Sequence, residues 1–193
     1  MKITAFLLAL SFAALSSVLY AQTPAAQPVA AQPAAAQAAA QNPIHIQDNL
    51  KFTVKTVNGD EVNFKDLLGK GPVLVDFWAL WCEPCKQEMK AFKAISDKFK
   101  AEGVTVIAIN TDQVRSLSKV RAYVNTQGFQ FPVLVDPDGD VARDIFSMET
   151  LPYSLILRPD GTVFAKHIGY TAGDELNDEK EVLDLISQLK KKS

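Results

Sequence analysis

Two cysteines, Cys82 and Cys85, are the residues in this sequence best suited to chemistry, and they are its only cysteines in 193 residues. Glu83 and Pro84 separate them, and they follow an apolar stretch that ends at Trp78. A cysteine at a helix N-terminus lies near unpaired backbone N–H groups and the positive end of the helix dipole, which stabilise a thiolate. A second thiol one turn later can resolve a mixed disulfide.

Other uses of such a pair fit the sequence less well. A zinc site needs four ligands, and the only histidines, His45 and His167, lie far apart in the chain. We expect His167, on a late strand, to be incidental. Attachment of a c-type haem needs histidine directly after the second cysteine, where Lys86 stands. A structural disulfide over so short a loop stabilises a fold little. The pair therefore predicts thiol–disulfide exchange with no metal and no cofactor.

The surrounding sequence alternates between expected strands and helices, which predicts an α/β fold. Asn58-Gly59 between two alternating runs predicts an N-terminal β-hairpin. The further expected strands are 72–78, 104–109, 131–135, 153–157 and 162–166, and the expected helices are 84–100, 117–124, 141–146 and 175–190. This order gives a mixed central sheet with helices on both faces. In the last helix we expect these side chains to face the core: Leu176, Val182, Leu183, Ile186 and Leu189.

The first 43 residues differ from the rest of the chain. Residues 1–21 combine Lys2 with an uncharged apolar run, which predicts a signal peptide or a membrane anchor, with residues 3–21 as the possible tether. Residues 22–43 form a linker rich in Ala, Pro and Gln, and 44–193 form one domain. The net charge of −2 and pI of about 5.7 argue against nucleic-acid binding.

The segment from Phe77 to Lys86, together with Leu151-Pro152, resembles the active site of thioredoxin-fold proteins. The Glu-Pro pair between the cysteines, the export signal, and an extra helix and strand after Asn110 are similar to the TlpA/ResA-like branch, which includes cytochrome c maturation thioredoxins. The resemblance covers about residues 44 to 190. It implies a thioredoxin fold with a helix–strand insertion after the βαβ unit.

The resemblance also implies roles for individual residues. Cys82 would be the nucleophile and Cys85 the resolving thiol. Leu151-Pro152 matches a cis-proline turn that faces the cysteines and leaves the Leu151 backbone free to pair with an extended substrate. We expect Trp81 to form an apolar docking surface beside the cysteines, while Trp78 belongs to the core. Pro84 completes the set of expected substrate contacts.

Asp76 stands inside an apolar strand, so its carboxyl should be buried and its pKa raised. It resembles the buried acid of thioredoxins that accepts the proton of the resolving cysteine. The lysine that the family places on the neighbouring strand is replaced by Ala108. A role for Asp76 as a local backbone cap stays open. Glu83 places negative charge near Cys82 and disfavours its thiolate, which favours a reductant; the alternative is a solvated surface charge.

These observations predict an exported protein-disulfide reductase in the periplasm or another extracytoplasmic space, with a role in cytochrome c maturation implied by the resemblance. Its expected partners are disulfide-bearing exported proteins and a membrane thiol electron donor, and the chain is expected to be a monomer. A dithiol oxidase or isomerase, and a non-catalytic peptide-binding folding helper, are the alternatives. A thiol peroxidase is disfavoured, because related peroxidases have threonine where Ala79 stands.

Overall fold

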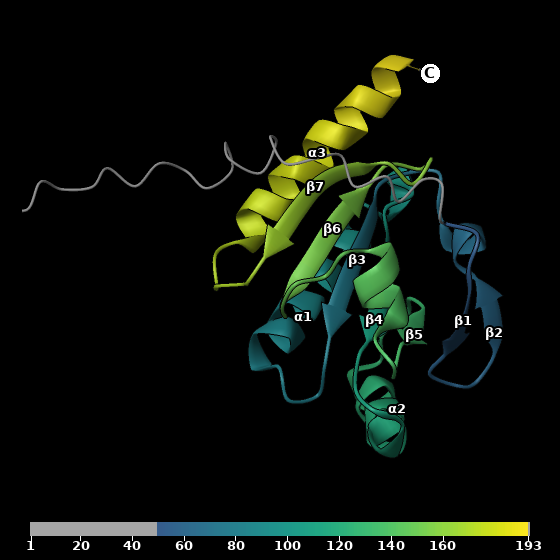
Figure 1. The fold of residues 1–193 in the computed structure, drawn as a ribbon. Coiled ribbons are helices and arrows are strands. Elements are labelled where there is room, and N and C mark those ends of the chain that lie inside the picture. Colours follow the sequence, from purple (N-terminus) through teal and green to yellow (C-terminus); the bar gives the residue numbers. More distant parts are fainter. Residues whose placement is uncertain (1–49, 193) are drawn as a thin grey trace, which may run out of the picture. The chain divides into compact units, whose positions relative to one another are not determined.

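The computed structural model describes residues 50–192. The segments 1–21 and 22–43, and the first residues of the domain expected at 44–193, lie outside the described residues. Figure 1 shows a central sheet with helices packed against it. The sheet has seven strands in the order β2-β1-β5-β4-β3-β6-β7. The strands are β1 (Thr53–Thr56), β2 (Glu61–Asn63), β3 (Val73–Trp78), β4 (Thr105–Asn110), β5 (Val133–Val135), β6 (Tyr153–Leu157) and β7 (Val163–Ile168).

The sheet is mixed, as the order of apolar runs predicts. β3 and β4 are parallel, as are β4 and β5, while β6 and β7 are antiparallel neighbours on one side and β1 and β2 on the other. The parallel strands are buried on both faces, which is why their sequences are continuous apolar runs. Gly59, with φ of +97°, closes the N-terminal hairpin at the predicted turn.

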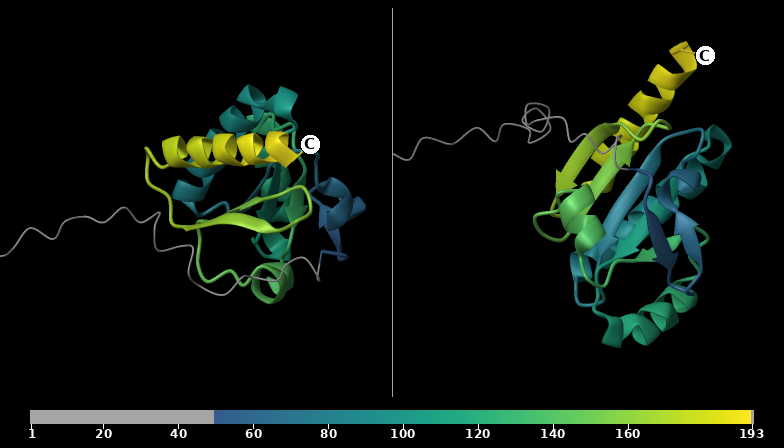
Figure 2. Two further views of the ribbon diagram at one scale, coloured as in Figure 1. Left: turned by 90° about the horizontal axis from the view of Figure 1, so that it is seen from above. Right: turned by 45° about the vertical axis from the view of Figure 1, so that its right-hand side comes forward.

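Helices cover both faces of the sheet (Figure 2). On one face α1 (Glu83–Lys98) and α3 (Glu175–Lys192) pack against Leu74 and Ile156, and α2 (Leu117–Gln127) packs beside them on Trp78 and Ala108. The opposite face is covered by a π-helical turn, η7 (Val141–Ile145), and by apolar side chains from the segment that follows β2, among them Phe64. Short 3-10 turns complete the fold: η4 (Phe64–Leu67), η5 (Lys100–Glu102) and η6 (Val114–Ser116). The predicted fold class is confirmed.

The prediction for the buried face of α3 is wrong in part. Val182 and Ile186 are buried as expected, but Leu176 is 72% exposed and Leu183 is 42% exposed. Leu185 is buried instead. Residues three and four apart share one helix face, so Val182, Leu185 and Ile186 form one stripe and Leu183 points about 100° away from Val182.

Within residues 50–192, no helix combines the length and the apolar character needed to span a bilayer.

Candidate active site

The two cysteines lie where β3 gives way to α1. Cys82 is the N-cap of α1, and the backbone N–H of Cys85 donates a hydrogen bond to its Sγ at 3.3 Å. The two sulfurs form a disulfide, with the Cα atoms 5.4 Å apart. Cys82 is 5% exposed and Cys85 is fully buried. When the bond opens, Cys82 is the sulfur nearer to solvent and the one that a backbone N–H stabilises as a thiolate.

Polar residues at the end of β4 hold the loop that leads into the cysteines. Asp112 accepts hydrogen bonds from the Leu80 backbone N–H at 2.7 Å and from Asn110 Nδ2 at 2.9 Å. The Asn110 side chain in turn accepts from the backbone N–H of Asp112 at 3.1 Å. The sequence analysis did not identify this pair. The sequence feature that indicates this pair is the position of two polar residues at the end of a buried parallel strand. The ends of such strands form the edge of the sheet at which α/β proteins commonly have their functional sites.

The two tryptophans near the cysteines differ in exposure, as predicted. Trp78 is completely buried, whereas Trp81 is 74% exposed. Pro84 stands in the first turn of α1 and is also exposed. On the other side, Leu151 packs against the apolar cluster that contains both cysteines, and its peptide bond to the buried Pro152 is cis. Of the four expected substrate contacts, Leu151 thus packs on the cluster of the cysteines, Pro152 follows it in the chain, and Trp81 and Pro84 are chain neighbours of Cys82 and Cys85.

Asp76 is completely buried in β3, as predicted. Neither of its carboxylate oxygens has a hydrogen-bond partner among the described residues, so a role as a local backbone cap is wrong. Its strand neighbour on β4 is the apolar residue Ala108. Burial, and then the charge of Glu88, raises the pKa of the Asp76 carboxyl well above its usual range.

A second buried acid, Glu88, was not identified from the sequence. It is 1% exposed and accepts a hydrogen bond from Ser154 Oγ at 2.6 Å. Burial raises the pKa of Glu88 to about 7, although the Ser154 hydrogen bond opposes this shift. The signal was its spacing, because Glu88 continues the buried stripe of α1 at Cys85 and Phe92. A charged residue on that stripe must reach into the core.

Glu83 is exposed, and it is paired with a cation that the sequence analysis did not assign. Its Oε2 lies 2.6 Å from Nζ of Lys86, and the Lys86 hydrogen bond and charge lower the pKa of Glu83. Lys86 also lies 5.8 Å from the ring centroid of Tyr123 on α2. The negative charge that the sequence places beside Cys82 is therefore accompanied by a positive charge.

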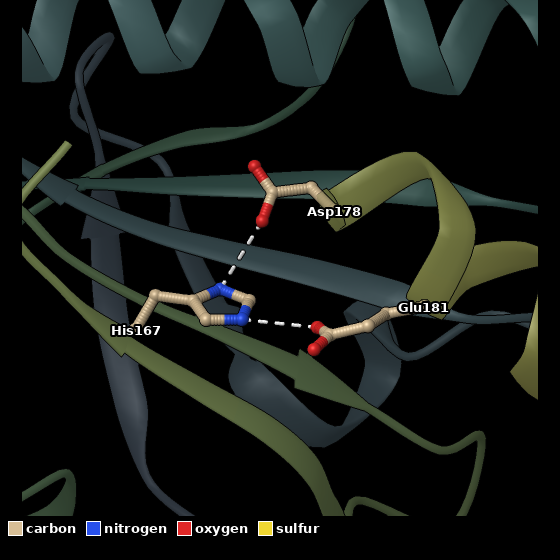
Figure 3. A group of neighbouring side chains, drawn as sticks. All are labelled: His167, Asp178 and Glu181. Atoms are coloured by element: carbon tan, nitrogen blue, oxygen red, sulfur yellow. Dashed lines mark ion pairs between the residues drawn. The ribbon is translucent and has the colours of Figure 1, made fainter. Parts of the chain in front are cut away.

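His167, which the sequence analysis expected to be incidental, has two acidic neighbours. Its ring lies between two carboxylates of α3 (Figure 3), with Nδ1 at 3.3 Å from Asp178 and Nε2 at 3.0 Å from Glu181. Burial pushes the pKa of His167 down, but the contact with Glu181 and the negative charges around it raise the pKa overall. Sequence separation hid this cluster, because its members come from a strand and from the helix that folds back over it.

Comparison with known proteins places these features in a family context. The sequence model of the AhpC/TSA family matches residues 46–166. The chain is 34% identical over 125 residues to the thiol-disulfide oxidoreductase ResA of Bacillus thuringiensis, covering 65% of this chain and 70% of that protein. It is also 34% identical over 135 residues to the thioredoxin-like protein YneN of Bacillus subtilis, covering 69% and 75% respectively.

Solved structures agree with the sequence relatives. A protein from Chlorobium tepidum, assigned as a thiol:disulfide interchange protein DsbE, superposes with a TM-score of 0.63 at 27% identity. The match covers 70% of this chain and 92% of that one. A thioredoxin-like protein from Porphyromonas gingivalis has a TM-score of 0.62 at 28% identity, covering 72% and 91%. The thioredoxin fold implied by the sequence resemblance is confirmed.

Proposed function

The chain belongs to the AhpC/TSA family and is a thiol-disulfide oxidoreductase of the ResA type, and on that premise we propose that it reduces disulfides in other exported proteins. The observation that carries this proposal is the cysteine pair at the start of α1, with a backbone N–H on the sulfur of Cys82. A non-catalytic folding helper does not explain this arrangement. Maturation of c-type cytochromes is one process that uses such a reductant.

In the proposed reaction the reduced enzyme attacks through Cys82. Its thiolate forms a bond to one sulfur of the substrate disulfide, and the other substrate sulfur leaves with the electron pair of the broken bond. Cys85 then loses its proton and attacks Cys82, which releases the second substrate sulfur and leaves the enzyme oxidised. The N-cap position supports this division of roles, because it stabilises the thiolate on Cys82 and not on buried Cys85.

A buried carboxyl pair takes up the proton that Cys85 releases. Glu88 is one helical turn beyond Cys85 on the same face of α1, and its charge acts on Asp76. Both carboxyls have raised pKa values, that of Glu88 to about 7. A group with a pKa near the working pH is suited to accept and return a proton.

The substrate binds as an extended segment across the exposed edge of the site. Trp81, at 74% exposure, offers a large apolar surface, and Pro84 extends it. The backbone of Leu151 forms no backbone hydrogen bond within residues 50–192, so it is free to pair with a substrate strand. Pro152 fixes the direction of that backbone.

The charges around the dithiol support the reducing direction of this proposal. Glu83 is the acid between the cysteines, and Lys86 is the cation paired with it. Glu88, whose pKa is raised to about 7, adds negative charge on α1 when it ionises. Negative charge disfavours thiolates, so it destabilises the reduced form of the pair and lowers its reduction potential. Export rests on the segment 3–21, and a reductant outside the cytoplasm needs a membrane thiol donor.

The reduction potential of the Cys82–Cys85 pair tests the proposal. The full chain is equilibrated against thiol buffers, and we expect a value near or below about −230 mV, toward that of thioredoxin. A value near about −120 mV would identify an oxidant or isomerase and overturn the reductase direction. In parallel, Cys82→Ala should abolish catalysed reduction of insulin, and turnover that survives this change would contradict the role of Cys82.

A further inference from the structure

A row of polar side chains crosses the sheet face that α1 and α3 cover. Asp76 on β3 is directly paired with Ser154 on β6, and Ser154 is directly paired with His167 on β7. Residues opposite each other on neighbouring strands point to the same face of a sheet. The three side chains therefore stand side by side, from the centre of the sheet to its edge.

Acidic side chains from the two helices cover this row. Glu88 of α1 accepts the hydrogen bond from Ser154 at 2.6 Å, and its other oxygen has no partner among the described residues. Asp178 and Glu181 of α3 lie against the two nitrogens of His167 (Figure 3). Asp174, in the loop before α3, adds a further negative charge that acts on both Glu88 and Asp178.

Exposure increases along the row from the centre of the molecule to the surface. Asp76 and Ser154 are 0% exposed and Glu88 is 1% exposed. The side chain of Asp178 is 5% exposed, and those of His167 and Glu181 are 23% and 22% exposed. Buried acids near the cysteines are thus followed by a cluster that reaches water.

We propose that His167, Asp178 and Glu181 form the solvent end of a proton route that connects Asp76 and Glu88 with bulk water. The route passes by Ser154 and Glu88 and then through the imidazole ring. It carries out the proton that Cys85 releases when it attacks the mixed disulfide, while the substrate thiolates take protons from solvent. In the reverse half-reaction it returns a proton to Cys85.

The opposite direction along the sheet offers no such groups. The residue paired with Asp76 on β4 is Ala108, and the one paired with Ala108 on β5 is Val133. Neither side chain can accept or donate a proton. A proton on the fully buried Asp76 therefore meets ionisable groups toward β6 and β7 and only apolar ones toward β5.

The imidazole of His167 is arranged for proton transfer. Each of its two nitrogens lies near its own carboxylate, Nδ1 at 3.3 Å from Asp178 and Nε2 at 3.0 Å from Glu181. These are ion-pair contacts and not hydrogen bonds, and a small adjustment of the side chains would let a proton enter at one nitrogen and leave from the other. Burial raises the pKa of Glu88 to about 7 and that of Asp178 to about 6, so their proton affinities are close to that of a histidine.

The test compares three variants of the full chain in single-turnover reactions with a disulfide substrate. His167→Gln and Glu181→Gln remove groups of the solvent end, and Glu179→Gln is the matched control. Glu179 is a nearby acid of α3 that pairs with Lys98 of α1 and lies outside the cluster. The measured quantities are the rate at which the second substrate thiol is released, its solvent deuterium isotope effect, and the effect of added imidazole.

We expect His167→Gln to slow this release about tenfold near neutral pH, less than the roughly hundredfold or greater loss typical of a group that takes the proton directly. The isotope effect should increase, and added imidazole should restore the rate. Glu181→Gln should show a smaller loss of the same kind, and Glu179→Gln should match the unmodified chain. A purely structural role of the cluster would not produce rescue by imidazole.

An unchanged rate and isotope effect in His167→Gln between about pH 6 and pH 8 would overturn the proposal. So would a slow rate that imidazole does not restore. If His167→Gln does not fold, Glu181→Gln decides by the same two criteria. The inference rests on the roles proposed for Cys85 and Asp76. The proposed function and the proton route can still fail separately, because Cys82→Ala removes all thiol–disulfide exchange, whereas His167→Gln retains it at a reduced rate.

Discussion

At the scale of single residues, the charge beside Cys82 is set by a pair and not by one acid. Glu83 alone would disfavour the Cys82 thiolate, but its carboxylate lies 2.6 Å from Lys86 Nζ. Both side chains belong to the first turns of α1, where charges act on the same helix end as the thiolate. Removing either charge leaves the other uncompensated. Substitution of Glu83 and substitution of Lys86 should therefore change the acidity of the Cys82 thiol in opposite directions.

We therefore predict that Glu83→Gln makes Cys82 more acidic and Lys86→Gln makes it less acidic. Because the pair is exposed to solvent, each change should be small, about twofold in the alkylation rate of the reduced enzyme near neutral pH. The double variant should return close to the unmodified rate. A double variant that keeps the full effect of Glu83→Gln would show that Lys86 does not compensate Glu83.

At the scale of elements, two glycines allow the connections at one end of the central strands to pass close together. Gly71 lies two residues before the start of β3, and a Cβ atom on it would lie 2.8 Å from the backbone carbon of Gly103, which lies two residues before β4. Backbone atoms cannot move aside as a flexible side chain can. The close approach therefore depends on the absence of a side chain at Gly71.

We expect Gly71→Ala to destabilise the protein by about 3 kcal/mol, because an overlap with backbone must be relieved by moving β3 against β4. The control is Gly128→Ala at the C-cap of α2, where the backbone has φ of +62° but an added Cβ meets nothing within 4 Å. That change should cost about 1 kcal/mol from the left-handed backbone alone. Denaturant unfolding measures both, and equal costs would show that the contact with Gly103 is not limiting.

The elements themselves could be predicted well from the sequence, for physical reasons. Continuous apolar runs mark the parallel strands, and Asn58-Gly59 and Gly128 mark where the chain turns. The cysteine pair could be predicted too, because its whole signal lies within four residues. The sheet register could not be predicted, and it alone sets Asp76, Ser154 and His167 side by side. A local sequence pattern cannot predict a feature whose residues come from distant segments of the chain.

At the scale of the whole molecule, buried carboxyls make stability depend on pH. Glu88 has an ordinary pKa of 4.5 when unfolded and about 7 in the folded protein. The folded state therefore binds more protons between these values, so the free energy of unfolding falls as the pH rises from about 4.5 to about 7. Below this range Glu88 is protonated in both states, so its ionisation does not change the free energy of unfolding. Above this range the folded protein carries the full penalty of a buried charge.

Glu88→Gln should remove this dependence while keeping an oxygen that accepts from Ser154. We predict that the variant gains up to about 3 kcal/mol of stability over the unmodified oxidised chain at pH 8, and that the gain vanishes near pH 4. Urea unfolding at a series of pH values measures the difference. A gain that is equal at both ends of the series would mean that packing, and not ionisation of Glu88, causes it.

Because the two tryptophans differ in exposure, their fluorescence can be distinguished. Trp78, the last residue of β3, and Trp81, in the loop before α1, are its only tryptophans. Trp78 is shielded from aqueous quenchers and Trp81 is open to them. An aqueous quencher such as iodide would therefore quench the fluorescence of Trp81 selectively, so that the unlabelled protein reports separately on its interior and on the surface at Trp81 where we propose that substrate binds.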